Sequence, residues 1–221
     1  GSIRNSLATS GDTSAPPTVI QGPMLGFVTG NEARVWVRLN GPFFVRAQYG
    51  PIENRNSRPN RISSEVQAFA KNDYTAVLHL ANLKPTKKYQ YKILFRNKNS
   101  LPQKTFSFRT LPQTDKPDFF RIAFGSCVSV DFDSTQEIWT TITNFDPTAF
   151  LWIGDNIYGD SSDLNVLREK YRRQRMVKRL LEFQASVPQL AIWDDHDYGQ
   201  NDGDRRFNGK RNALKAFREY W

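Results

Sequence analysis

Three short polar segments, each directly after an apolar run, carry the residues that are best suited to chemistry. They are Gly125-Ser126-Cys127, Gly154 to Asp160, and Asp194-Asp195-His196-Asp197. Short, nearly continuous apolar runs are typical of buried strands in a parallel sheet. Ligands of such sheets bind at the carboxyl ends of the strands. We therefore expect the three segments to converge on one edge of one sheet.

The second segment contains the pattern Gly154-Asp155-x-x-Tyr158. A glycine at a strand end lets the backbone pass close to a bound ion, and the carboxylate of Asp155 could bridge two cations. Tyr158 would be an unusual ligand, because only a strongly acidic ion such as ferric iron deprotonates a phenol at neutral pH. The alternative is a strand-end aspartate that caps a turn and a tyrosine packed in the core.

The third segment places three carboxylates around His196 within five residues. Such crowding is costly unless cations neutralise it, so the cluster favours a hard or borderline metal. Asn201 and Asp202 follow as further oxygen donors, and Asn201 is our candidate for substrate binding. The alternative is a solvated acidic turn with a pH-sensitive histidine. The chain's other histidine, His79, falls within an alternating strand pattern, so we expect it on the surface.

Cys127 is the single cysteine of the chain, which excludes an intrachain disulfide. A lone cysteine after a strand is more often an inert buried thiol than a ligand. Its position facing the other two segments favours a thiolate metal ligand. A redox or nucleophilic thiol is the weaker alternative, because no base pairs with Cys127 in the sequence and His196 lies among carboxylates.

A strand-helix-strand pattern positions the three segments. Strands are predicted at residues 119–124, 148–153 and 189–193, and helices at 135–144, 164–183 and 212–221. Ser134 and Glu137 form a predicted capping box for the first helix. We expect that helix to turn Ile138, Ile142 and Phe145 inward.

The first half of the chain has the alternation of an all-β domain. Alternating apolar residues predict five strands, which fit one β-sandwich, at residues 33–39, 43–49, 74–80, 89–95 and 104–109. The run from Leu83 to Tyr91 resembles the tyrosine corner of fibronectin type III domains, in which a hydroxyl bonds to nearby backbone. We predict a flexible arm at 1–15, a fibronectin III-like sandwich at 16–110, a linker at 111–117 and an α/β domain at 118–221.

Composition and charge limit the classes of protein to which this chain could belong. Hydrophobic residues make up 38% of the chain and aromatic residues 13%, which excludes global disorder. The net charge of +9 favours anionic ligands such as phosphates, nucleic acids or acidic membrane surfaces, without choosing among them. The densest run of cations, between Leu167 and Leu181, is typical of a solvated helix face. No apolar run approaches the roughly 18 residues of a membrane span, and residues 1–5 have no signal-peptide core.

Taken in order, these motifs resemble the PhoD family of alkaline phosphatases and phosphodiesterases, within the metallophosphoesterase superfamily. The resemblance rests on the fibronectin-like domain and on Phe-Gly-Ser-Cys127, Gly-Asp155-x-x-Tyr158, Trp-Asp-Asp195-His196 and residues 213–221. Purple acid phosphatases share the fibronectin-like domain and the Gly-Asp-x-x-Tyr motif. They lack the cysteine segment, and they usually have Gly-Asn-His where this chain has Asp194-Asp195-His196.

The resemblance implies that the α/β domain is the first half of a four-layer α/β/β/α sandwich. It implies ferric iron held by Cys127, Asp155 and Tyr158, and calcium that shares Asp155 and reaches Asp195. His196 would hydrogen-bond the phosphate or assist the leaving oxygen. A metal-bound hydroxide would attack the phosphorus of a mono- or diester. The family also implies an extracytoplasmic location, periplasmic or secreted.

The predicted metal shell is incomplete in this sequence. The family's second half brings further aspartate and histidine ligands, whereas no histidine follows His196 here. The remaining half would come from a longer chain or a partner chain, unless catalysis has been lost. The competing hypothesis is a non-catalytic module, whose sandwich and arginine-rich helix bind an anionic polymer, surface or protein.

Overall fold

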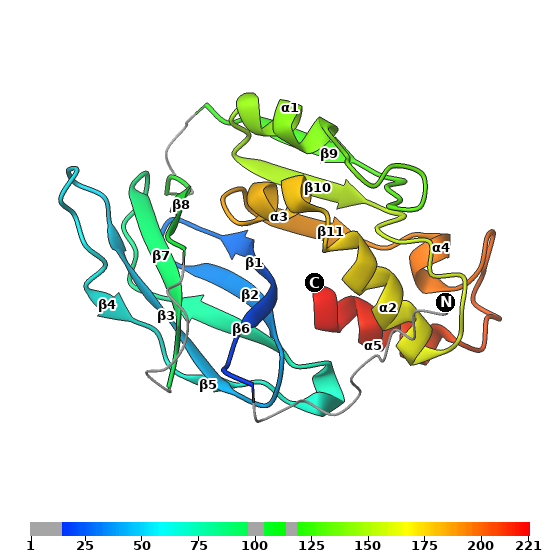
Figure 1. Ribbon diagram of the computed structural model, residues 1–221. Coiled ribbons are helices and arrows are strands. Elements are labelled where there is room, and N and C mark those ends of the chain that lie inside the picture. The colour runs from blue at the N-terminus through cyan, green and yellow to red at the C-terminus, as the bar shows by residue number, and fades with distance from the viewer. Residues whose placement is uncertain (1–14, 97–103, 114–118) are drawn as a thin grey trace, which may run out of the picture.

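The computed structural model describes residues 15–96, 104–113 and 119–221. The N-terminal half is built of antiparallel strands, and the C-terminal half combines a parallel sheet with most of the helices (Figure 1). Most of the predicted arm at 1–15 and of the predicted linker at 111–117 lies outside the described residues, so both stay predictions. No helix in the described ranges is long and apolar enough to cross a membrane.

The N-terminal half is a sandwich of two antiparallel sheets around one apolar core. One sheet has the order β1-β2-β6, with β1 at Val19–Val28, β2 at Ala33–Leu39 and β6 at Thr75–Leu80. The other has the order β4-β3-β7-β8, and β5 also pairs with β3; the bounds are Phe44–Pro51 for β3, Arg61–Ile62 for β4, Val66–Gln67 for β5, Lys88–Phe95 for β7 and Phe106–Arg109 for β8. A short 3-10 helix, η1 (Ala70–Asn72), precedes β6.

All five predicted strands of this half are confirmed within about two residues. Three further strands were not predicted. The register shifts along β1 interrupt the alternation that would have revealed it, and β4 and β5 are only two residues long. The tyrosine corner is also confirmed, because the Tyr89 hydroxyl accepts a hydrogen bond of 2.8 Å from the backbone N–H of Lys84.

The C-terminal half contains a parallel sheet of three strands in the order β11-β10-β9. The strands are β9 at Ile122–Gly125, β10 at Ala149–Ile153 and β11 at Gln189–Ile192. The helices are α1 at Ile138–Asn144, α2 at Leu164–Gln174, α3 at Lys178–Gln184, α4 at Asp195–Tyr198 and α5 at Lys210–Tyr220. The parallel arrangement confirms the prediction that the three polar segments leave the same edge of one sheet.

The prediction of one long helix over 164–183 was wrong, because the chain bends between α2 and α3. Val177 is extended there, with ψ of 115°. The buried side chain of Arg175 packs against the rings of Trp36 and Trp221, at 4.7 and 4.5 Å from their centroids. Burial lowers the pKa of Arg175 to about 10. The bend lets α2 pack against α5 while α3 packs against α1 and β1.

The start and the buried face of α1 also differ from the prediction. The predicted capping box of Ser134 and Glu137 does not form. Instead, the side chain of Asp133 caps the preceding turn by accepting hydrogen bonds from the backbone N–H groups of Thr135 and Gln136. Trp139 is the buried residue of the helix, and it packs on Phe150 and Phe183. Ile138 and Phe145, predicted to point inward, are exposed, whereas Ile142 packs partly against this core.

One face of the parallel sheet is exposed, although it is apolar. The helices α1 and α3 contribute to the core on the other face, where Phe150 and Trp152 are buried. The side chains that alternate with these are 43% to 68% exposed: Ile122, Phe124, Ile153, Leu190 and Ile192. We call these five residues the open face.

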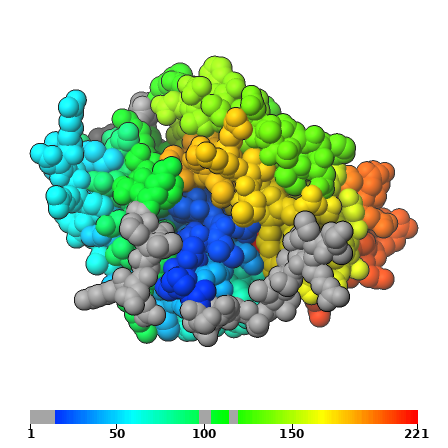
Figure 2. All heavy atoms as spheres, in the orientation of Figure 1, coloured from blue at the N-terminus to red at the C-terminus, as the bar shows by residue number. Residues whose placement is uncertain are grey.

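The two halves share a third apolar core at their junction. Met24 of β1 and Trp36 of β2 pack there with residues of α2 and α5, namely Leu167, Tyr171, Ala213, Ala216 and Tyr220. Figure 2 shows β1, in blue, beside the yellow and gold atoms of α2 and α3. The indole N–H of Trp36 also donates to the backbone oxygen of Glu219 at 2.7 Å. The sandwich therefore packs against and supports the helices near the predicted site.

Most cations of the arginine-rich segment have a partner within the chain, some of them buried and others at the surface, so the prediction of a solvated helix face holds only in part. Arg168 and Arg175 are buried. The ion pairs are Arg168 with Glu219, Arg172 with Asp73, Arg173 and Lys170 with Asp131, and Arg179 with Glu137. These pairs leave little of the segment's charge for an anionic ligand.

Candidate metal centre

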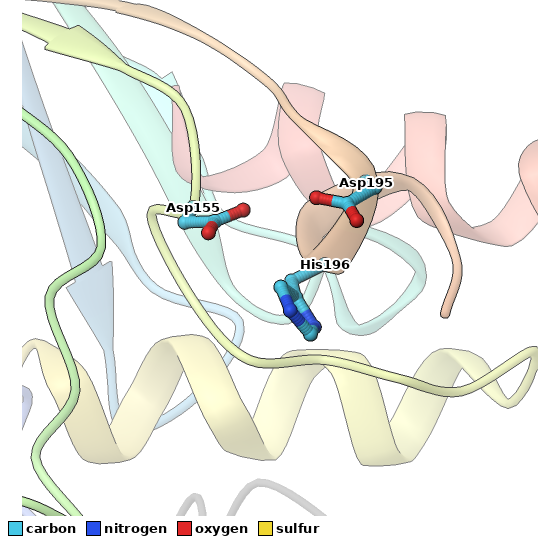
Figure 3. Close-up of side chains that lie close together, drawn as sticks. All are labelled: Asp155, Asp195 and His196. Atoms are coloured by element: carbon cyan, nitrogen blue, oxygen red, sulfur yellow. The ribbon is translucent and has the colours of Figure 1, made fainter. Parts of the chain in front are cut away.

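The carboxyl edge of the parallel sheet brings together two of the predicted metal ligands and the predicted catalytic residue. Asp155, Asp195 and His196 each offer one ligand atom, and these atoms lie within 4.8 Å of one another. Asp155 follows β10, and the other two residues begin α4, directly after β11. In Figure 3 the two carboxylates face each other across a short gap, and the His196 ring lies beside them.

Cys127 and Tyr158 adjoin this cluster from the loops after β9 and β10. The Cys127 Sγ lies 3.4 Å from the Oδ2 of Asp155. The ring centroid of Tyr158 is 4.5 Å from that of His196. The pKa of Tyr158 is raised, mainly by partial burial and to a lesser extent by electrostatic repulsion from Cys127 and Asp155. A cation bound among these groups would act in the opposite direction and favour the phenolate.

The backbone at the ends of β9 and β10 is constrained in ways that fit a built site. Gly154 has φ of +116°, and a Cβ added to it would lie 2.6 Å from the Cβ of Asp194. Cys127 and Asp155 both have left-handed φ values, 58° and 46°. Such conformations cost about 1–3 kcal/mol each in residues other than glycine and gather at functional sites. Gly154 therefore permits the close approach of the loops that follow β10 and β11.

Asp155 itself indicates a cation. Its Oδ1 atom is buried and has no hydrogen-bond partner among the described residues. A buried carboxylate oxygen without a partner costs stability unless a positive charge satisfies it. Carboxylate, imidazole, thiol and phenol groups together suit a transition metal, and the carboxylate oxygens also suit a hard cation. The residues present therefore fit a metal site.

His196 is oriented by Asp160, a residue whose role the sequence reasoning missed. The Nδ1 of His196 lies 2.6 Å from the Oδ1 of Asp160. Partial burial would lower the pKa of His196, but the bond to Asp160 and the nearby carboxylates outweigh it and raise the pKa. The sequence signal was only a carboxylate two residues after Tyr158. This contact leaves the Nε2 of His196 as the ring nitrogen for a ligand.

Asp195 and Asn201 both form hydrogen bonds with Asp202. The backbone N–H of Asp202 donates to Asp195 at 2.6 Å and lowers the pKa of its carboxyl. Asn201 donates to the side chain of Asp202 at 2.8 Å. Its predicted contact with substrate stays a prediction. Asp194 caps α4, and its side chain accepts from the backbone N–H of Asp195 at 3.0 Å.

Asp197 joins the two loops that carry the cluster. Its buried carboxylate accepts hydrogen bonds of 3.0 to 3.1 Å from the backbone N–H groups of Asn156, Ile157 and Asp194, and a fourth from the Asn156 side chain. Burial is the main cause that raises its pKa to about 6. Because these donors flank Asp155 and Asp195, Asp197 sets the separation of those two ligands.

Replacing Asp197 with asparagine is expected to lower metal affinity about 10- to 100-fold, as is usual when a group that orients a ligand is lost. The amide would turn an N–H toward one of the backbone donors, which should also cost roughly 2 kcal/mol of stability. Calorimetric titration with metal and thermal unfolding would measure the two effects. An Asp146→Asn variant is the control, since Asp146 is exposed and lies outside the cluster. Equal affinities of the two variants would contradict the assignment.

Comparisons with known proteins agree with this architecture. The model of a domain of unknown function, DUF7800, matches residues 16–113. No curated protein sequence matches the chain. Among solved structures, one described as the structure of PhoD has a TM-score of 0.76 and 17% identity; the match covers 94% of this chain and 47% of that one.

A purple acid phosphatase, PPD1, isolated from seeds of yellow lupin (Lupinus luteus), has a TM-score of 0.62 and 16% identity. The match covers 93% of this chain and 40% of that one. The chain thus spans less than half the length of either structure. At these identities the likeness concerns the fold, and nearly the whole chain takes part in it.

Proposed function

We propose that this chain is part of a metal-dependent phosphoesterase, similar to the PhoD alkaline phosphatases and phosphodiesterases, that hydrolyses phosphate mono- or diesters. The observation that carries the proposal is the buried, unpartnered oxygen of Asp155, whose carboxylate faces Asp195 and His196 at the carboxyl edge of a parallel sheet. The likeness of the fold to PhoD and to a purple acid phosphatase supports it.

The proposed cofactors are ferric iron and calcium. Cys127, Asp155 and Tyr158 would hold the iron, because thiolate and phenolate ligands suit a strongly acidic ion. Asp155 and Asp195 would hold the calcium through carboxylate oxygens. When bound, such ions supply Lewis acidity and an activated water at neutral pH.

His196 is the proposed catalytic residue of the chain itself. Its raised pKa keeps a larger fraction of the ring protonated near neutral pH. Protonated His196 would donate through Nε2 to a phosphate oxygen or to the leaving oxygen of the ester. Asp160 holds Nδ1 and so keeps Nε2 directed to the substrate. This contribution should decline as the pH rises through the pKa of His196.

The open face indicates how the site is completed. Exposed apolar patches of this kind mark interaction surfaces. We propose that a second sheet, from a longer polypeptide or from a partner chain, packs on these five residues and supplies the remaining ligands. This would make the α/β half the first part of a four-layer α/β/β/α sandwich. The share of the PhoD structure that the chain spans, 47%, supports this arrangement.

Replacing Ile122 of the open face with aspartate is therefore expected to reduce hydrolysis by the whole protein at least about tenfold, because a charge would be buried between two sheets. The variant tests packing, since Ile122 begins β9 and the site lies at the other end of that strand. Turnover and thermal unfolding of the whole protein would be measured. The control is Ile62→Asp in the sandwich, where Ile62 is 52% exposed. If both variants behave like wild type, the open face is not covered by a second sheet.

The assay that tests the function compares p-nitrophenyl phosphate with bis(p-nitrophenyl) phosphate, using the whole protein loaded with iron and calcium. We expect turnover of at least one ester, and their ratio would give the preference for mono- or diesters. A metal-loaded protein that hydrolyses neither would favour the alternative of a non-catalytic binding module. The extracytoplasmic location is a separate proposal, which fractionation of the source cells would test.

A further inference from the structure

A groove lies between the sandwich and α5, and exposed cations gather along it. The groove has a volume of about 750 Å³. Its walls are the β5-η1-β6 segment on one side and α5 on the other (Figure 1). Four exposed cations line it: Lys71, Arg211, Lys215 and Arg218. Apolar side chains lie between them: Val66, Phe69, Val77 and Leu214.

These cations differ from those of the arginine-rich segment. Among the described residues, Lys71, Arg211 and Arg218 have no carboxylate within ion-pair distance. Lys215 reaches Glu219 only at 3.9 Å, and Arg168 already binds both oxygens of that carboxylate. Glu219 is the one acidic residue that lines the groove, and its charge is neutralised by the buried Arg168. The groove therefore presents uncompensated positive charge to solvent.

The helical wall presents its charges in a row. Arg211, Lys215 and Arg218 follow the spacing i, i+4, i+7 and therefore share one face of α5. They extend over about 10 Å along the helix axis. The opposite face of α5, with Ala213 and Ala216, is buried in the junction core. Because the opposite face is buried, the row of cations stays exposed to solvent. Such a row favours a ligand that carries several negative charges along its length.

The other wall offers the edge of a sheet. β6 is the last strand in the order β1-β2-β6, and β2 is its only paired strand in the described part of the chain. Thr75, Ala76 and Val77 of this edge strand line the groove. An edge strand presents unpaired backbone N–H and C=O groups, which can pair with an extended peptide.

The two walls are held at a fixed separation. The guanidinium of Arg168 donates to the backbone oxygen of Lys71 at 2.8 Å and to Glu219 at 2.6 Å. Arg168 lies on α2, so one buried side chain ties the sandwich wall to the helical wall. The groove is therefore preformed, which lowers the entropic cost of binding.

We propose that this groove binds an extended acidic segment of a partner polypeptide. The segment adds a strand to β6 and turns its carboxylates toward Arg211, Lys215 and Arg218. Its alternate apolar side chains contact Val77 and the other apolar residues of the groove. The free sheet edge favours a polypeptide over a phosphate polymer, because a phosphate polymer has no backbone N–H groups to pair with a strand. The proposal does not depend on the hydrolytic activity.

The test measures fluorescence anisotropy of a labelled peptide in which glutamate alternates with valine, added to the metal-free protein in chelator. Wild type is compared with the double variant Arg211→Gln/Arg218→Gln. The control is Arg55→Gln/Arg58→Gln, which removes the same charge from two exposed arginines of the turn before β4. We expect about tenfold weaker binding for the groove variant. The control should bind within about twofold of wild type. Unchanged thermal unfolding would show that both variants are folded.

A second peptide, in which glutamate alternates with proline, tests the strand addition. Proline lacks the N–H that a strand pair requires, so this peptide should bind at least about tenfold more weakly at equal charge. Equal binding of the two peptides would overturn strand addition, and equal losses in the two double variants would overturn the groove. Tighter binding of a single-stranded oligothymidylate than of the peptide would assign the groove to a phosphate polymer. No binding of the alternating glutamate-valine peptide would also overturn the proposal.

Discussion

Replacing Asp155 with asparagine is expected to remove the bound metal and to lower phosphoester hydrolysis by the whole protein at least about a thousandfold. Asp155 is the only candidate ligand assigned to both ions, and it contributes the buried oxygen that has no partner among the described residues. Asparagine keeps the size of the side chain and tolerates the left-handed φ of 46° at this position. The variant therefore removes a charge without forcing a new backbone.

Elemental analysis of the purified variant and turnover of p-nitrophenyl phosphate would measure the two losses. The matched control is Asp146→Asn, because Asp146 has nearly the same φ, 48°, and lies on the surface after α1. The control should retain both metal and turnover. Full activity in an Asp155→Asn protein that has lost its metal would contradict the proposed mechanism.

Replacing Asp73 with asparagine is expected to lower the free energy of unfolding by about 3–5 kcal/mol, because it breaks a buried ionic network at the junction of the two halves. Asp73 accepts hydrogen bonds from Arg38, at 2.9 and 3.1 Å, from Arg172, at 2.9 Å, and from the hydroxyl of Tyr220. These partners come from β2, α2 and α5. Asparagine accepts the left-handed φ of 54° at this position, so the effect reports the lost charge.

Thermal unfolding should show a midpoint lower by roughly 10 °C. Burial would raise the pKa of Asp73, but the bonds from Arg172, Arg38 and Tyr220 outweigh it, so the folded-state pKa lies below the unfolded value. The stabilisation is therefore complete above the unfolded pKa, about 4, and is lost as the pH falls through the folded-state pKa. The difference between wild type and variant should shrink below about pH 4.

The control for Asp73 is Asp204→Asn, which breaks a surface ion pair with Arg206. That pair is exposed, and its loss should change the free energy of unfolding by less than about 1 kcal/mol. A similarly small effect at Asp73, or an effect that stays constant into strong acid, would show that the network does not hold the halves together.

Much of the candidate site could be predicted from sequence, because it follows from short-range patterns. An apolar run followed by Cys127, Asp155 or Asp195 predicts a strand end, and parallel strands bring their carboxyl ends to one edge. Asp160 and Asp197 could not be assigned in this way. Asp160 contacts His196 from a loop in which Asp160 itself has a left-handed φ. The hydrogen bonds of Asp197 join the loop after β10 to the start of α4. Such paths depend on tertiary structure and leave no periodic signal.

The errors in the fold have a similar origin. The helical pattern over 164–183 carries no local sign of a break at Arg175, whose partner Trp36 lies far away in the sequence. The expectation that Ile138 and Phe145 point inward rested only on their hydrophobicity and helical spacing, which do not show which face of the helix packs on the sheet. Both are exposed here, on a helix whose other face packs around Trp139. Local propensity therefore predicted the elements better than their boundaries or their buried faces.

The most direct test of a metal-dependent phosphoesterase is turnover of p-nitrophenyl phosphate and its bis-ester by the whole protein, measured alongside its metal content. The protein would be assayed as isolated, after removal of metal by a chelator, and after return of iron and calcium. We predict that turnover disappears with the metal and returns with it, in proportion to the metal bound. Turnover that persists in the metal-free protein, or none when metal is bound, would contradict the assignment of Cys127, Asp155, Tyr158, Asp195 and His196 to this chemistry.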